Sequence, residues 1–217
     1  MDNRVYQAVN PGVERWPTID SMSAPRVLAP ADYRRMPWRN GGGLTWEIAA
    51  HPPGADLAAF AWRVSVAEIR ESGPFSAFPG VDRTLVLLRG EGMRLSGEGA
   101  PVEMRTPYEP VTFRGEAAVD CTLTGGPTRD FNLMVRRDAA RGEVRVVRGE
   151  GEAVAPASAY VCYSAAGACE CLLAGMPPIE VAAEHALIVE GEARTGGLLV
   201  NPTAPQAVAL VAVIDAR

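Results

Sequence analysis

Three segments of the chain carry residue types that could bind or transform a small polar molecule. The first, residues 36–48, reads MPWRNGGGLTWEI and surrounds three consecutive glycines with Trp, Asn and Glu side chains. Glycine allows backbone conformations and close approaches that other residues do not, so this segment could form one wall of a ligand cavity. It could equally be a loop between two strands with Glu47 on the surface. No Lys-Ser or Lys-Thr pair follows the glycines at the required spacing, which excludes a phosphate-binding P-loop.

The second segment, residues 72–83, reads SGPFSAFPGVDR and places two phenylalanines beside prolines and glycines, ahead of Arg83. The planar guanidinium group of arginine can bind a carboxylate through two parallel hydrogen bonds. The segment therefore fits an anion anchor at Arg83 behind an apolar pocket lip made of Phe75 and Phe78. The structural alternative is an ion pair between Arg83 and Asp82 or another neighbouring acid.

The third segment, residues 125–137, reads GGPTRDFNLMVRR. In an extended strand Asp130 and Asn132 share one face with Met134, while the apolar residues between them form the opposite face. If other elements cover both faces, these polar side chains must hydrogen-bond within the protein or to a ligand. If one face is open to solvent, they are ordinary surface residues, and the sequence leaves both alternatives open.

The elements that must position these segments are predicted to be β-strands. Residues 60–70 are rich in strand formers, and alternation places Arg63 and Ser65 on the same face. Residues 84–88 form a continuous apolar run that is typical of a strand buried on both faces. Further candidate strands between Gly- and Pro-rich turns are residues 45–49, 119–123, 131–136, 143–147, 159–163, 171–173, 186–189 and 207–214. Since no 12-residue segment shows a helical period, we predict an all-β fold, a sandwich or a barrel.

An internal similarity suggests a duplicated β-domain. Residues 85–91, LVLLRGE, resemble residues 186–192, ALIVEGE, at an offset of 101 residues. Both are apolar strand candidates followed by a glycine turn, and their spacing is close to half the chain length. A chance match of this common pattern is the alternative.

The composition excludes several classes of protein. The chain has 217 residues, 47% of them hydrophobic, with a net charge of −5, four cysteines and two histidines. No apolar run approaches the roughly 20 residues that span a membrane, and the start lacks the apolar core of a secretion signal. Charges of both signs are interspersed without a basic block, which argues against nucleic-acid binding. The few cysteines argue against a disulfide-stabilised secreted fold. We therefore expect a cytoplasmic protein with no membrane or nucleic-acid partner, and a homodimer is compatible with the sequence.

The residues that commonly bind metals are few and scattered. His51 and His185 cannot supply a three-histidine centre. Cys169 and Cys171 would point to the same side of a strand, but structural zinc sites usually have four ligands, with two to four residues between paired cysteines. We therefore expect no metal and no other cofactor, with the cysteines as buried, inert thiols.

Four motifs that follow one another in order closely resemble the HutD/Ves family. They are PWRNGGG at 37–43 followed by Thr45 and Glu47, WRVS at 62–65, GPFSAFPG at 73–80 followed by Asp82 and Arg83, and DFN at 130–132 followed by Arg136 and Arg137. The resemblance covers roughly residues 26–217. It implies a bicupin, in which two jelly-roll (RmlC-like) β-barrels of the cupin type lie in one chain.

We expect a flexible leader at residues 1–25, an N-terminal barrel at 26–140 and a degenerate C-terminal barrel at 141–217, with strand exchange between the barrels left open. The resemblance implies an association with bacterial histidine utilisation and, for the Ves branch, with a stress response. It implies no established reaction, and it favours a regulatory or ligand-sensing role.

The resemblance to cupins also implies what replaces the metal ligands. When Gly90 is aligned with the last glycine of the metal-binding cupin motif, Arg83 takes the glutamate position, and Ser76 and Phe78 take the two histidine positions. Arginine is a cation and offers no ligand atom to a divalent ion. The pocket is therefore expected to prefer an anion to a metal.

These inferences combine into one leading hypothesis, a metal-independent protein that binds a small carboxylate-bearing metabolite, with Arg83 and Arg63 as anchors. The expected ligand-binding residues are Trp38, Asn40, Glu47, Arg63, Ser65, Phe75, Ser76, Phe78, Arg83, Asp130 and Asn132. An enzyme is the first alternative: a metal-free cupin isomerase or epimerase acting on a small acid or sugar, with Glu47 or Asp130 as general base. An interaction module that binds no small molecule is the second.

Overall fold

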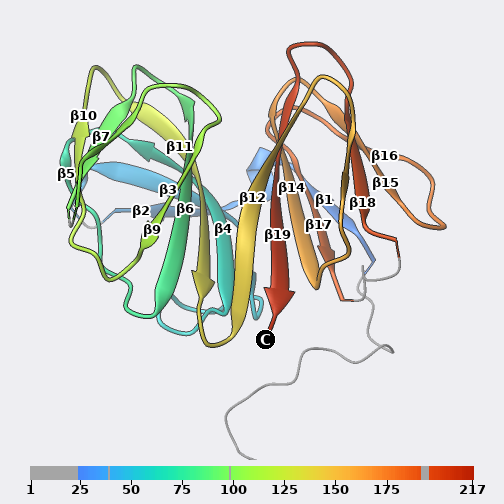
Figure 1. Ribbon diagram of the computed structural model, residues 1–217, viewed down its shortest axis with the longest axis horizontal. Coiled ribbons are helices and arrows are strands. Elements are labelled where there is room, and N and C mark those ends of the chain that lie inside the picture. Colours follow the sequence, from blue (N-terminus) through green and yellow to red (C-terminus); the bar gives the residue numbers. More distant parts are fainter. Residues whose placement is uncertain (1–23, 39, 98, 192–195) are drawn as a thin grey trace, which may run out of the picture.

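The computed structural model describes residues 24–38, 40–97, 99–191 and 196–217 of the chain. Within these residues nineteen β-strands form four antiparallel sheets, and the helical content is one 3₁₀ turn, η1 (Pro30–Asp32). The two halves of the chain lie side by side, each built from a large and a small sheet (Figure 1). The prediction of an all-β fold is confirmed. Of the expected leader, residues 1–23 lie outside the described residues.

The first half contains the segments predicted to carry chemistry. Its large sheet has the order β2 (Arg34–Pro37), β3 (Gly43–His51), β4 (Trp62–Ile69), β11 (Thr128–Arg136), β6 (Val81–Arg89) and β9 (Pro110–Arg114). Its small sheet has the order β5 (Gly73–Pro74), β10 (Asp120–Leu123), β7 (Met93–Ser96) and β8 (Val102–Met104).

The second half has a similar arrangement and includes a strand from the start of the described chain. Its large sheet has the order β1 (Arg26–Leu28), β17 (Ala186–Glu190), β14 (Ala159–Ala166), β19 (Val208–Ala216) and β12 (Ala140–Arg148). Its small sheet has the order β13 (Glu152–Val154), β18 (Leu198–Pro202), β15 (Cys169–Leu173) and β16 (Ile179–Val181). Although β1 precedes β2 in sequence, it pairs with β17, so that Val27 lies opposite Leu187.

Alternation of side chains explains why the sheets stack as layers. On β4, Trp62 and Val64 belong to a central apolar cluster that also contains Phe131 of β11 and Leu210 of β19, so the two large sheets pack against each other. The other face of each large sheet, called here the inner face because it lies inside that half, is covered by the small sheet through an apolar cluster of its own. The large sheet of the first half is therefore covered on both faces.

Strand prediction succeeded for long buried strands and failed for short, half-exposed ones. Strands β7, β8 and β9 were not predicted, because charged or polar residues interrupt their short apolar patterns.

The internal similarity falls on corresponding features of the two halves: β6 and β17 are each followed by a glycine with positive φ, Gly90 at 105° and Gly191 at 91°. In the described residues no helix has the length and apolar character needed to cross a membrane.

Phe131→Ala tests whether the central cluster couples the two halves. Phe131 is fully buried, and its ring centroid lies 5.8 Å from that of Tyr163 on β14. Truncation leaves a cavity, so we expect the free energy of unfolding to fall by about 3–5 kcal/mol in a single transition. Chemical denaturation followed by far-ultraviolet circular dichroism, which reports on the strands of both halves, measures this change. The control Val102→Ala, at an exposed position, should shift it by less than about 0.5 kcal/mol. Two separate transitions would argue against a shared core.

Candidate functional site

A cavity of about 700 Å³ lies on the inner face of the large sheet of the first half. Strands β4, β6 and β11 contribute to its floor, and the segments around Trp38 and Phe75 contribute to its rim. Cavities of this size commonly hold small ligands. Nine of the eleven expected ligand-binding residues line it: Trp38, Asn40, Arg63, Phe75, Ser76, Phe78, Arg83, Asp130 and Asn132. The other two, Glu47 and Ser65, are buried next to Arg63 but do not belong to the lining.

The register of the strands determines which side chains meet in the cavity. On the central strand β11, Met134 lies opposite Arg63 of β4 and Arg83 of β6. Asn132, two residues earlier, lies opposite Ser65 of β4. Cross-strand partners project from the same face of a sheet, so the two arginines flank Met134, with two strand spacings, roughly 10 Å, between their backbones.

Arg83 is a buried cation held by aromatic rings. Its guanidinium carbon lies 5.0 Å from the ring centroid of Phe75, 5.7 Å from that of Phe78 and 5.1 Å from that of Phe113. Such contacts stabilise a cation through the electron-rich ring faces. Burial lowers the pKa of Arg83 to about 10, so the group stays charged at neutral pH. Its Nε atom is buried without a hydrogen-bond partner, and no carboxylate in the described part of the chain forms an ion pair with it.

Asp130 and Asn132 present buried polar atoms near this cation. Both side chains are buried, because the small sheet and the cavity rim cover the face of the large sheet that carries them, while the opposite face of β11 packs against the second half. The sequence left open whether Asp130 and Asn132 are buried or on the surface, and the structure shows that they are buried. The Asn132 Oδ1 atom has no hydrogen-bond partner in the described structure. Burial raises the pKa of Asp130 from its ordinary 3.8 to about 7, although the charge of Arg83 opposes this shift.

Arg63 differs from Arg83 because a carboxylate already neutralises it. Its Nε atom donates a hydrogen bond of 2.6 Å to Oε2 of Glu47, and both side chains are buried. Glu47 also lies 3.6 Å from Arg34, and Arg63 donates to Ser65 Oγ at 3.4 Å. Both arginines were expected to anchor an anion. Arg63 lines the cavity with its charge balanced by Glu47, whereas Arg83 has no ion-pair partner among the described residues.

Gly43, the last of the three glycines in the first segment, allows Trp38 to pack at the cavity rim. A Cβ atom on Gly43 would lie 2.7 Å from the carbonyl oxygen of Glu68 and 2.8 Å from Cδ2 of Trp38. Only glycine leaves room for this contact. The indole Nε1 donates a 2.8 Å hydrogen bond to Thr45 Oγ1, and the ring meets Phe75 edge-on at 6.5 Å.

Phe113 and Met36 are among the contributors to the site that sequence reasoning missed. Phe113 supplies the third ring beside Arg83, but it lies on β9, which was not predicted as a strand. Met36 lines the cavity, and its sulfur accepts a hydrogen bond of 3.4 Å from Arg63. The apolar alternation of Val111 and Phe113 within β9 was the available signal for the first of these residues.

The sequence profile of the HutD family matches residues 30–208. The chain belongs to the HutD family. A HutD-region relative, an uncharacterised 21.2 kDa protein in the hutC 3′ region of Pseudomonas putida, is 38% identical over 180 residues that cover 83% of this chain and 94% of the relative. Protein Ves of Citrobacter koseri is 43% identical over 119 residues, covering 53% of this chain and 61% of Ves. The resemblance to the HutD/Ves family is therefore confirmed.

Solved structures agree with this HutD assignment. HutD from Pseudomonas fluorescens SBW25, solved in a formate condition, is 33% identical, with a TM-score of 0.77 over 89% of this chain and 100% of that protein. An oxalate decarboxylase from Lactobacillus farciminis, solved as a formate complex, has a TM-score of 0.61 at 7% identity over 92% of this chain and 87% of its own. A likeness at that low identity shows the fold alone.

The HutD cavity does not fit the divalent metal that metal-binding cupins hold. Asp130 is the one carboxylate among its described lining residues, and none of them is His or Cys. Arg83 places a positive charge near that carboxylate. A divalent ion requires several oxygen, nitrogen or sulfur ligands, so this set of side chains suits an anion instead.

Asp130→Asn should change how stability depends on pH. The pKa of the Asp130 carboxyl is raised in the folded state to about 7. The folded protein therefore loses stability as pH rises from the unfolded pKa of this group to its folded pKa. Above pH 7 the buried carboxylate therefore lowers the free energy of unfolding of the wild type. Asp130→Asn avoids this loss because its amide is neutral. We expect the variant to gain roughly 2–3 kcal/mol relative to wild type between pH 5 and pH 8.

Urea denaturation at a series of pH values measures this difference. Asp120→Asn, at an exposed position of the same half, controls for the loss of a carboxylate. A difference between Asp130→Asn and wild type that stays constant from pH 5 to pH 8 would show that Asp130 is ionised normally.

Proposed function

We propose that this HutD-family protein binds a small carboxylate-bearing metabolite in the first-half cavity, independently of any metal. One observation carries the proposal: Arg83 is a buried cation facing a cavity of about 700 Å³, with no carboxylate among the described residues paired to it. An unpaired buried charge is costly, and a bound carboxylate would offset that cost through bidentate hydrogen bonds.

The surrounding groups suggest how such a ligand would be recognised. The free acceptor atom Asn132 Oδ1 would take a hydrogen bond from an N–H or O–H group of the ligand. Phe75, Phe78 and Trp38 would supply apolar walls. Below about pH 7 Asp130 is protonated, which leaves the charge of Arg83 unopposed and favours an incoming anion.

The proposed role is regulatory or accessory, in histidine utilisation or a stress response. The support is membership of the HutD family and a relative located in the hutC 3′ region of Pseudomonas putida. We propose a cytoplasmic location, since the four cysteines are free thiols and thiols persist in reducing compartments. In this proposal the ligand-binding unit is residues 26–140 without β1, which pairs in the second half, and residues 141–217 together with β1 form a second, degenerate barrel.

Arg83→Lys and Arg83→Ala test the anion anchor. Formate, acetate, L-glutamate and carboxylate intermediates of histidine breakdown serve as probes in thermal denaturation and calorimetric titration. A probe at 100 times its Kd should stabilise the wild type by about 2.7 kcal/mol. Loss of a charged bidentate contact, roughly 3 kcal/mol, should weaken binding about 100-fold in Arg83→Ala. Arg83→Lys keeps the charge without the planar fork and should bind at an intermediate level.

Arg94→Ala is the matched control, because it removes an exposed arginine on β7 of the same half. This variant should keep the full shift of the wild type. If Arg83→Ala binds the same carboxylate with undiminished affinity, Arg83 is not the anchor. If no carboxylate shifts the wild type, the interaction-module alternative gains support.

A second function, general acid–base catalysis on a small acid or sugar, is favoured by one observation. Asp130 lines the cavity, and its raised pKa of about 7 lies where a general base works well. Glu47, the other candidate base, is ion-paired with Arg63 and lies outside the cavity lining. Incubation of the probes with the protein, followed by NMR, discriminates the two functions. An enzyme would accumulate product and lose turnover in Asp130→Asn, whereas a sensor leaves its ligand intact.

A further inference from the structure

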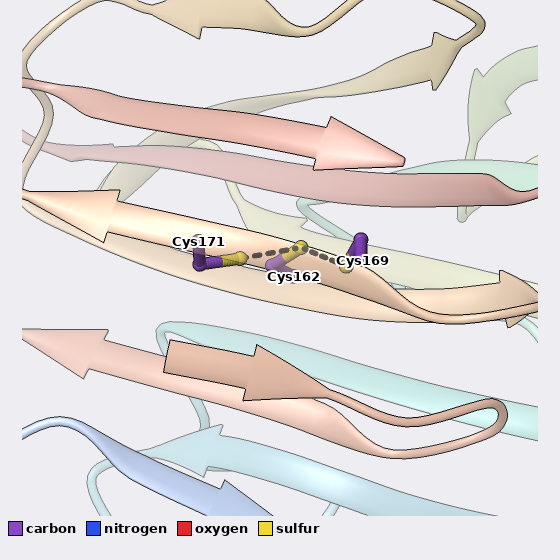
Figure 2. Close-up of side chains that lie close together, drawn as sticks. All are labelled: Cys162, Cys169 and Cys171. Carbon is purple, nitrogen blue, oxygen red and sulfur yellow. Dashed lines mark hydrogen bonds between the residues drawn. The ribbon is translucent and has the colours of Figure 1, made fainter. Parts of the chain in front are cut away.

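Three cysteine thiols gather inside the second half, away from the cavity. Cys162 lies on β14 of the large sheet, and Cys169 and Cys171 lie on β15 of the small sheet that packs against it (Figure 2). All three side chains are buried, and no two of their sulfur atoms are more than 4.8 Å apart. The sequence predicted buried, inert thiols. Only Cys169 and Cys171 could be placed together from the sequence, because Cys162 is on a different strand.

The sulfur atoms are spaced as ligands of one metal ion would be. Cys171 Sγ donates to Cys162 Sγ at 3.6 Å, and Cys162 Sγ lies 4.0 Å from Cys169 Sγ. Three sulfurs placed about 2.3 Å from a central ion, the length of a zinc–thiolate bond, would be separated by roughly 4 Å. Small side-chain rotations would therefore direct all three toward one point, without a shift of either strand.

We propose that Cys162, Cys169 and Cys171 form a binding site for a soft monovalent metal ion of the Cu(I) type. Thiolate ligands select soft ions. A closed zinc site requires four ligands, and among the described residues no fourth His, Cys, Asp or Glu completes this cluster. Apart from the Ser164 hydroxyl, which contacts Cys169, the surrounding side chains are apolar, including Val181, Leu187 and Val200, and they offer no carboxylate ligand of the kind that hard cations prefer.

The chain places this cluster near the surface at one end of the second half. Cys169 follows the exposed Gly167, which has a φ of 66° in the tight connection between β14 and β15. Local opening of this connection, rather than of the whole core, would admit an ion.

Anaerobic titration of the reduced full-length chain with Cu(I), in competition with the chelator bicinchoninate, tests the proposal. We expect one Cu(I) per chain, a near-ultraviolet sulfur-to-copper charge-transfer band, and three sulfur neighbours at about 2.3 Å by X-ray absorption. Cys162→Ala and Cys171→Ala should each weaken binding more than roughly 100-fold, because losing a ligand costs more than losing an outer contact, which costs about 10–100-fold.

Cys121→Ala is the matched control. It removes the fourth buried thiol, which lies in the first half and donates to Met93 Sδ at 3.6 Å, and it should leave Cu(I) affinity unchanged. The X-ray absorption measurement uses the unaltered chain, so it counts the sulfur ligands of Cu(I) even where an alanine variant does not fold. Fewer than three sulfur neighbours, equal affinity for Zn(II), or equal loss in Cys121→Ala would each overturn the proposal.

Discussion

The burial of the first-half large sheet on both faces is the constraint on which the rest of the site depends. One face packs against the second half, and the other faces the small sheet and the cavity. Polar side chains on the inner face therefore cannot rely on bulk water, and each must find a partner or remain unsatisfied. Arg63 meets this requirement through Glu47, whereas Arg83 relies on aromatic rings and leaves its hydrogen-bonding capacity unused. That difference separates the structural arginine from the one available to a ligand.

The two halves have similar layers of sheets but different side chains between those layers. In the first half, arginine, aspartate and asparagine interrupt the apolar inner face and a cavity remains. In the second half, the corresponding space between the sheets holds an apolar cluster of described residues that includes three cysteine thiols. Because backbone hydrogen bonds and the central core hold the sheets together, the interior side chains are free to differ without altering the fold.

Features whose sequence pattern lies within a single strand could be predicted from the sequence, whereas features that depend on the pairing of distant strands could not. The alternation in β4 and β11 identified the face that carries Arg63, Asp130 and Asn132, since that pattern lies within single strands. The Glu47–Arg63 pair and the third ring beside Arg83 depend on which strands become neighbours, and local patterns do not specify that pairing. The thiol cluster was missed for the same reason, because its members come from two facing sheets.

The position of β1 has a consequence for how the chain assembles. This strand comes before every other in the described sequence, yet its hydrogen-bonding partner β17 lies about 160 residues later. During synthesis β1 must therefore wait, unpaired, until most of the chain has left the ribosome, and such distant pairings slow folding. The first half also cannot be excised at the sequence midpoint without removing an edge strand from its neighbour. The two halves are thus connected through this edge strand as well as through their shared apolar core.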